Sequence, residues 1–163
     1  MSKNFFHIDI KRCVGCYACV IACMDQNDLK ATKNEPKWRD VKSFFDEERL
    51  KYVSLACMHC QDAPCVASCK TLAIVKNPIT GLVGTDETKC NGCRMCAKSC
   101  TFGFPKFNDE GKIQKCNGCE IRVAYGYEPA CVKICPTKAL KYGFVENLEK
   151  EKNLKMLSEI INR

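Results

Sequence analysis

The sequence predicts an α+β fold in which clusters bound by cysteines take the place of a large apolar core. Three observations lead to this prediction. The 163 residues include 16 cysteines, which fall into four groups of four with none left over. Between the groups, short apolar stretches flank turn-forming residues, which indicates β-hairpins. The last stretch of the chain has the spacing of an amphipathic helix.

The spacing of the cysteines indicates iron–sulfur clusters. The first and third groups read C-x2-C-x2-C-x3-C, the run that binds [4Fe–4S] clusters in bacterial ferredoxins. The second and fourth groups keep the opening C-x2-C and the closing C-x3-C, and lengthen only the middle. Four complete groups predict four clusters. The groups are Cys13, Cys16, Cys19 and Cys23; Cys57, Cys60, Cys65 and Cys69; Cys90, Cys93, Cys96 and Cys100; and Cys116, Cys119, Cys131 and Cys135.

Two other uses of cysteine fit the sequence less well. A disulfide framework requires an oxidising compartment, and the N-terminus has no apolar run of signal-peptide length. Zinc is held by two cysteine pairs with a longer spacer between them, whereas here the third and fourth cysteines follow closely. Only His7 and His59 could serve as mixed ligands. Iron–sulfur clusters are therefore the prediction.

The charge balance agrees with bound clusters. The formal net charge of +7 counts cysteine as neutral. Thiolate-bound clusters are anionic, so basic residues would compensate them internally rather than bind phosphates. We expect the lysines near the ligands to be solvated surface residues, with tuning of cluster potential as the alternative. They are Lys11, Lys70, Lys89, Lys98, Lys115, Lys133 and Lys138.

The sequence also indicates a location. No stretch approaches 18 uncharged apolar residues, and the N-terminus has no twin arginines. We therefore expect a cytoplasmic protein without a membrane anchor.

Four elements are expected along the body of the chain. Phe5–Ile10 alternates like a strand that leads into the first cysteine group. Within the insertion 24–56, residues 27–37 are polar and predict a loop, and Trp38–Phe45 and Leu50–Leu55 flank a charged turn. Hairpins are also expected at 73–83, around the turn 77–81, and at 105–114, around 108–111.

The C-terminal segment is expected to form an amphipathic helix. Its polar face is rich in Glu and Lys, which favours helix formation. The helix could pack on its own chain or present a stripe to a partner or a second copy. The apolar residues are Leu148, Leu154, Leu157, Ile160 and Ile161, with Met156 on the flank.

These motifs resemble one family. The order of the four groups, the sequence from Cys57 to Cys65 (CMHCQDAPC) and the lengthened fourth group are similar to the four-cluster ferredoxin subunits of the molybdenum or tungsten bis-pterin oxidoreductases, the dimethyl-sulfoxide-reductase group. The short form is most similar to subunits that accompany formate dehydrogenases and hydrogenases. The chain departs from two-cluster ferredoxins in that only Cys135, among the last cysteines of the groups, is followed by proline.

The resemblance implies two ferredoxin-like units, one inserted in the other. Residues 1–35 and 101–145 would form the outer unit, 36–100 a hairpin insertion plus the inner unit, and 146–163 the C-terminal helix. Sequential pairing of the groups is also open on the sequence alone. The crossed ligand rule then implies the sets Cys13, Cys16, Cys19 and Cys135; Cys116, Cys119, Cys131 and Cys23; Cys57, Cys60, Cys65 and Cys100; and Cys90, Cys93, Cys96 and Cys69.

The expected function is electron transfer without catalysis. The sequence has no Gly-rich dinucleotide loop, P-loop or nucleophile–base pair that would indicate an enzyme. The chain is expected to relay single electrons between a catalytic molybdenum or tungsten subunit, of the formate dehydrogenase type, and a second partner such as a hydrogenase or another ferredoxin-type subunit. The alternatives are a freely diffusing polyferredoxin and a zinc-knuckle nucleic-acid binder.

Overall fold

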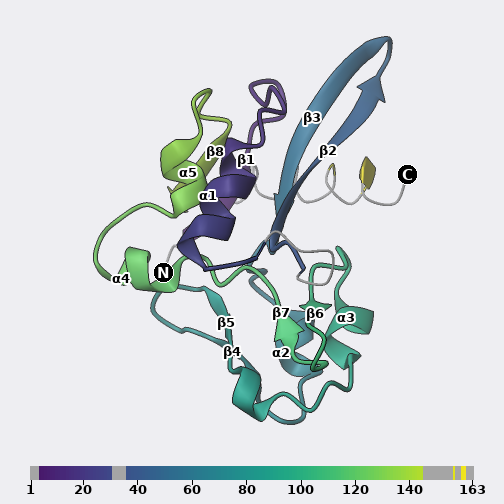
Figure 1. The fold of residues 1–163 in the computed structure, drawn as a ribbon, viewed down its shortest axis with the longest axis vertical. Helices are drawn as coiled ribbons and strands as arrows, with labels where there is room; N and C mark the ends of the chain where they lie inside the picture. The colour runs from purple at the N-terminus through teal and green to yellow at the C-terminus, as the bar shows by residue number, and fades with distance from the viewer. Residues whose placement is uncertain (1–3, 31–35, 145–155, 157–158, 161–163) are drawn as a thin grey trace.

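The computed structural model describes residues 4–30, 36–144, 156 and 159–160. Within these residues the strands pair in twos, and short helices lie between them (Figure 1). This arrangement is the mixed helix and strand fold that the sequence predicts. Each hairpin or helix borders a cysteine group, so the secondary structure serves mainly to position ligand loops.

The two ends of the described body lie together in one sheet. β1 (Asn4–Ile8) pairs antiparallel with β8 (Leu140–Phe144), with Ile8 opposite Leu140. Helix α1 (Ala18–Gln26) packs against α5 (Ala130–Ile134) beside this sheet. The first strand is confirmed. Strand β8 was not predicted, because its pairing partner lies at the opposite end of the chain.

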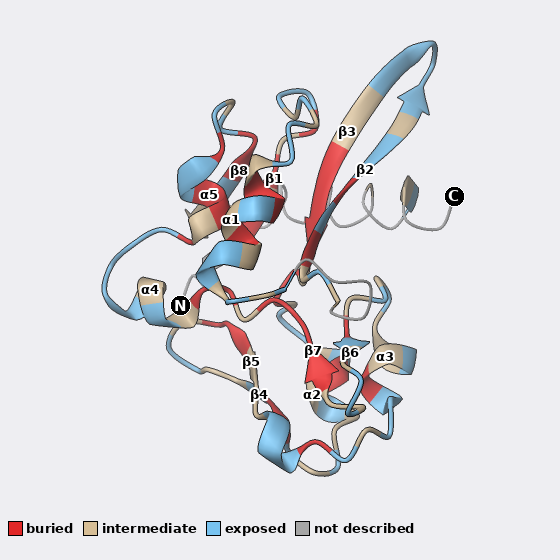
Figure 2. Ribbon diagram, viewed as in Figure 1, coloured by how far each residue is buried: buried red, intermediate tan, exposed pale blue. Residues whose placement is uncertain are grey.

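The predicted hairpin in the insertion is confirmed. β2 (Arg39–Asp46) and β3 (Arg49–Ala56) pair in register around a two-residue turn, and Glu47 adopts a positive φ of 55° there. Figure 2 shows that the hairpin is buried at its base and exposed toward its tip. Its buried side chains, Val41, Val53 and Leu55, join the core that contains β1 and β8.

The two other predicted hairpins are also present. β4 (Ile74–Lys76) pairs with β5 (Val83–Thr85), and the Asn77 side chain accepts hydrogen bonds from the amides of Ile79 and Thr80 in the turn. β6 (Lys106–Phe107) pairs with β7 (Ile113–Gln114). Short helices complete this half: α2 (Pro64–Ala67), η1 (Glu87–Lys89) and α3 (Met95–Ser99), with α4 (Glu120–Ala124) leading toward α5.

The buried residues form two clusters. The larger one contains residues of β1, α1, the hairpin base, α5 and β8. The smaller one is built around Ile74, Val83 and Ile113, with cysteines among its members. The hairpin β2–β3 thus packs with the larger core, although the sequence-based division groups residues 36–56 with the inner unit. Its alternating apolar face, rather than its place in the chain, explains this packing.

Three tail residues are described, and two of them contact the larger core. Met156 and Ile160 are partly buried against it, and both are helical. The remaining residues of the predicted stripe, Leu148, Leu154, Leu157 and Ile161, lie outside the described residues. Across the described part of the chain, no helix combines the length and apolar character needed to span a bilayer.

Candidate iron–sulfur sites

The four ligand loops share one backbone feature. In every group the residue two positions after the first cysteine has a positive φ: Gly15, His59, Gly92 and Gly118. This turn directs amides inward, as where Gly118 N–H donates to Cys116 Sγ at 3.4 Å. At Gly15 glycine is also required by space, because a Cβ there would lie 2.4 Å from the Tyr52 ring.

The first site brings together the beginning and the end of the cysteine series. Two sulfurs come from the loop before α1, a third from the first turn of α1, and the fourth from the end of α5. One cavity is lined by all four. Burial raises the pKa of the Cys13 thiol, and the three other sulfurs raise it further against a hydrogen bond from Gly15. The first site consists of Cys13, Cys16, Cys19 and Cys135.

The second site lies beside the first, deeper in the protein. Burial, followed by the charge of Cys116, raises the pKa of Cys23 to about 12, and Cys131 and Cys119 add to the effect. Burial likewise raises the pKa of Cys116 to about 11. Asn27 Nδ2 lies 3.8 Å from Cys23 Sγ and donates to the Cys23 carbonyl at 2.8 Å. The sulfurs that act on one another here define the second candidate site: Cys116, Cys119, Cys131 and Cys23.

The third site again has four sulfurs around one cavity. Burial raises the pKa of Cys65 to about 11, with Cys57, Cys100 and Cys60 contributing. His59 braces this loop, since its Nδ1 accepts a hydrogen bond from Val83 N–H at 2.9 Å. Burial, together with Lys115, Lys76 and Arg39, holds the pKa of His59 well below its usual value, so the ring is a neutral acceptor. The third site consists of Cys57, Cys60, Cys65 and Cys100.

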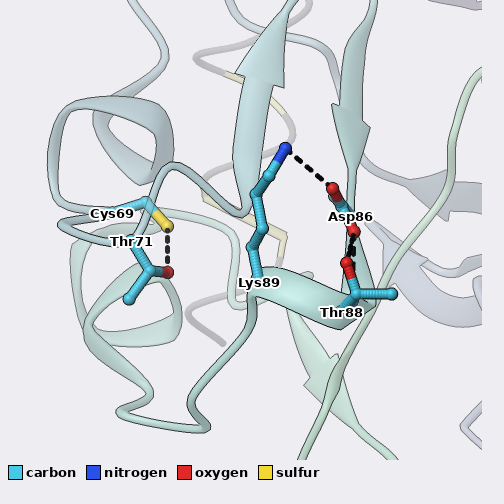
Figure 3. Close-up of polar contacts among 5 residues, drawn as sticks. All are labelled: Cys69, Thr71, Asp86, Thr88 and Lys89. Atoms are coloured by element: carbon cyan, nitrogen blue, oxygen red, sulfur yellow. Dashed lines mark hydrogen bonds and ion pairs between the residues drawn. The ribbon is translucent and has the colours of Figure 1, made fainter.

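The fourth site lies between α2 and α3. Burial raises the pKa of Cys96, and a hydrogen bond from the Ala97 amide opposes this effect. The charges of three other sulfurs raise the pKa further: those of Cys69, Cys90 and Cys93. Figure 3 shows the Thr71 hydroxyl directed at Cys69 Sγ, at 3.7 Å, and the nearby contacts of Asp86 with Thr88 and Lys89 that begin η1. The sulfurs that act on Cys96, together with Cys96 itself, define the fourth candidate site: Cys90, Cys93, Cys96 and Cys69.

An internal repeat supports the last cysteines of the second and fourth groups. Thr137 lies 3.8 Å from Cys135 Sγ just as Thr71 lies near Cys69 Sγ. Leu72 and Lys138, three residues after each cysteine, have positive φ values of 55° and 54°. Burial acts to raise the pKa of Cys69 and of Cys135. Hydrogen-bond donors in the loop after each cysteine have the larger combined effect, so both pKa values are lowered. The two segments therefore repeat one another in local structure as well as in sequence.

The donor sets suit iron–sulfur clusters. Burial and the neighbouring sulfurs disfavour the bare thiolate at eight of the sixteen cysteines, and at these positions a cationic metal core would supply the missing compensation. Among the described residues, no three His, Cys, Asp or Glu side chains are placed to share a single metal ion. In the first and third sites the four sulfurs instead border one shared cavity.

Comparison with known proteins shows the family of this chain. The model of the 4Fe–4S dicluster domain matches residues 48–145. The B subunit of anaerobic dimethyl sulfoxide reductase from Escherichia coli is 36% identical, over 90% of this chain and 76% of its own length. The chain belongs to the 4Fe–4S dicluster family. The resemblance to iron–sulfur subunits of molybdenum-pterin oxidoreductases is thereby confirmed.

Two further relatives carry the names of other oxidoreductases. The thiosulfate reductase electron transfer subunit PhsB of Salmonella typhi is 37% identical, over 86% of this chain and 76% of its own length. A formate dehydrogenase iron–sulfur subunit of Haemophilus influenzae is 34% identical, over 87% of this chain and 52% of its own length. The named reactions differ, whereas the electron-transfer part is shared.

Interactions between neighbouring residues connect the four candidate sites in a row, from the first to the fourth. The sulfur of Cys19 in the first site acts on the pKa of Cys131 in the second. Cys57 of the third site acts in the same way on Cys116 of the second. Helices α2 and α3, joined by a 2.9 Å hydrogen bond between Ser68 and Ser99, connect the third and fourth sites. The exposed cysteines among the sixteen are Cys16 and Cys93, in the first and the fourth site.

Two buried cations lie beside the row. Lys115 is 1% exposed, and its Nζ donates to the carbonyls of Val83 and Cys116 at 2.5 and 2.7 Å. The expectation of a solvated lysine is therefore wrong for Lys115, whereas the six other lysines near the ligands are exposed. Arg39 is 2% exposed and was not singled out by its sequence context. A charged residue at a strand end is ordinarily a surface feature, so no sequence signal marks Arg39.

Proposed function

We propose that this chain is a non-catalytic electron-transfer subunit that relays single electrons through four [4Fe–4S] clusters. The observation that carries the proposal is the row of four all-cysteine sites, with exposed ligands at its two ends. A row of one-electron centres, entered at one end and left at the other, is the arrangement that a relay requires.

The ligand sets that we propose are the four sites as defined above. Each takes three cysteines from one group and the last cysteine of another. This crossed pattern is supported by the mutual effects of the sulfurs on each other's pKa and by the two shared cavities. Sequential pairing of neighbouring groups would leave Cys13 and Cys135 in different sites.

The crossed pattern supports a nested organisation. The first and fourth groups would form the outer unit, joined by the β1–β8 sheet and the packing of α1 on α5. The second and third groups would form the inner unit around α2 and α3. Phe107 and Ile113 pack with the smaller core, so we place the second boundary between the units after β7 rather than at residue 101.

The residues of the chain hold, shield and tune the bound centres. When bound, the clusters supply one-electron redox chemistry, while the protein sets potential through hydrogen bonds, charge and burial. Amides such as Gly118 N–H and hydroxyls such as those of Ser54 and Thr71 donate toward sulfurs. Burial of most ligands excludes water from the interior sites.

The partner that we propose is a catalytic molybdenum or tungsten pterin subunit of the formate dehydrogenase type. A hydrogenase or a second ferredoxin-type subunit would be the other electron partner. The relatives named as formate dehydrogenase subunits support the first part of this proposal. The density of free cysteines supports a reducing compartment, which we propose to be the cytoplasm.

Anaerobic purification from the native cells tests the proposed function. We expect the chain to co-purify with a pterin-bound subunit, and the complex to bleach reversibly when the substrate of that subunit is added. A brown monomer without a partner, reduced equally well by several enzymes, would favour the freely diffusing polyferredoxin. Colourless protein with salt-sensitive affinity for RNA would favour the zinc-knuckle alternative.

The tail provides a separate prediction. Replacing both Met156 and Ile160 by Ser should lower the melting temperature by about 4–8 °C, since each partly buried side chain contributes about 1 kcal/mol. Met95→Ser, at an exposed apolar residue, is the matched control. If the melting temperature is unchanged and the protein instead loses its partner or self-association, the helix serves an interface, as the alternative interpretation of the sequence holds.

A further inference from the structure

A single buried arginine lies at the junction of the first and second sites. Arg39 begins β2, and its side chain reaches inward from the base of the hairpin. Its Nη1 donates to Ser54 Oγ at 2.9 Å, and the same hydroxyl lies 3.2 Å from Cys19 Sγ of the first site. Ser54 therefore links the guanidinium to a ligand of the first site.

The same guanidinium lies near three ligands of the second site. The sulfurs that act on it are those of Cys131, Cys116, Cys19 and Cys23, in order of effect. Burial opposes the positive charge of Arg39, yet these sulfurs outweigh it and raise the pKa. The arginine therefore keeps its charge between the two sites, as guanidinium groups do in proteins.

Apart from these sulfurs, few groups around Arg39 compensate its positive charge. Its Nε has no hydrogen-bond partner among the described residues, and the Phe6 ring lies 5.8 Å from its central carbon. No carboxylate forms an ion pair with Arg39 within the described part of the chain. A buried cation is costly unless anions compensate it, and here the sulfurs of two sites are the neighbouring anions.

We propose that Arg39 is a positioning residue shared by the first and second sites, whose fixed positive charge raises the reduction potential of the clusters bound in both. This inference rests on the proposed function. A reduced cluster carries one more negative charge than an oxidised cluster, so a nearby cation stabilises the reduced state. The fourth site, none of whose sulfurs is among those that act on Arg39, is not expected to share the effect.

Redox titration of the whole chain, monitored by electron paramagnetic resonance, tests the proposal. Arg39→Met should lower the reduced-to-oxidised ratio of the first two clusters at least tenfold at a fixed solution potential. For a one-electron couple, a tenfold change corresponds to a fall of about 59 mV in the reduction potential. The fourth cluster should keep its potential. The signals are assigned by Cys16→Ser, Cys23→Ser and Cys93→Ser, which disturb the first, second and fourth sites respectively.

Two further variants test whether the effect comes from the local charge of Arg39 rather than from the shape of its side chain or from the net charge of the protein. Arg39→Lys should keep the potentials of both clusters within about threefold of the native reduced-to-oxidised ratio at the same potential, because the charge is retained. Arg49→Met removes the same charge from the exposed end of the same hairpin, and should change none of the potentials.

The outcomes are distinguishable. Unchanged potentials in Arg39→Met overturn the proposal, and so does an equal shift in Arg39→Met and Arg39→Lys. If Arg39→Met fails to load iron, the proposal stands only if Arg39→Lys loads fully with near-native potentials; failure of both would make Arg39 a packing residue. Absence of iron–sulfur clusters from the native protein would instead refute the proposed function.

Discussion

Protein purified without oxygen should contain about sixteen iron atoms and about sixteen acid-labile sulfides per chain, and chelating that iron should unfold it. The physical reason is the small size of the two cores. Cysteines are members of both, and more than half of the sixteen are buried. Without metal, the metal–sulfur bonds that connect the separate ligand loops would be lost.

The measurement combines metal analysis with thermal unfolding. The loaded protein should show a cooperative transition in circular dichroism, and the chelated protein should show none. Reconstitution with iron and sulfide should restore the transition, which controls for irreversible damage. Near-stoichiometric zinc with little sulfide, or an iron-free chain that still melts cooperatively, would contradict the prediction.

Replacing Cys135 by Ser should disturb the same cluster as replacing Cys13, although the two residues are 122 positions apart in the sequence. Each change should remove about four iron atoms or convert one paramagnetic signal. The reason is that both sulfurs line one cavity and that Cys135 contributes to the raised pKa of Cys13. Replacing Cys116 should likewise disturb the same cluster as replacing Cys23.

The matched control for this pairing lies inside one motif. Cys13 and Cys23 belong to the same group of four, yet they are assigned to different sites. Their Ser variants should therefore affect different signals in electron paramagnetic resonance. If Cys13 and Cys23 variants lose one common signal, or if Cys135 and Cys116 variants do, the crossed ligand sets are wrong.

Local sequence patterns were sufficient for much of the fold. The turn residues at 77–81 and 108–111 predicted two hairpins, because side chains such as that of Asn77 cap their own turn. The charged turn 46–48, flanked by Trp38–Phe45 and Leu50–Leu55, predicted the long hairpin β2–β3. The short strand β8 and helix α4 were not predicted, since the first depends on a distant partner and the second interrupts a cysteine spacer.

The cysteine chemistry could also be predicted, since C-x2-C spacing is a short-range property of a single loop. The positive φ at Gly15, Gly92 and Gly118 follows from glycine in these loops, whereas His59 at the equivalent position gave no such signal. The hydrogen bond from Val83 to His59 shows why histidine is used there: its ring braces the loop. Here local sequence and tertiary contact act together.

The remaining features depend on residues distant in the sequence. The approach of Cys135 to Cys13 requires the β1–β8 sheet, and the burial of Lys115 requires the carbonyl of Val83 on another hairpin. Arg39 reaches Ser54 across its own hairpin, and Ser54 reaches Cys19 of α1 because the hairpin packs on the larger core. The sequence thus determined the donor atoms and the local turns, because neighbours along the chain set both. Which sulfurs share a site, and which cations lie beside them, was decided by tertiary packing, because electrostatic interactions depend on distance through space.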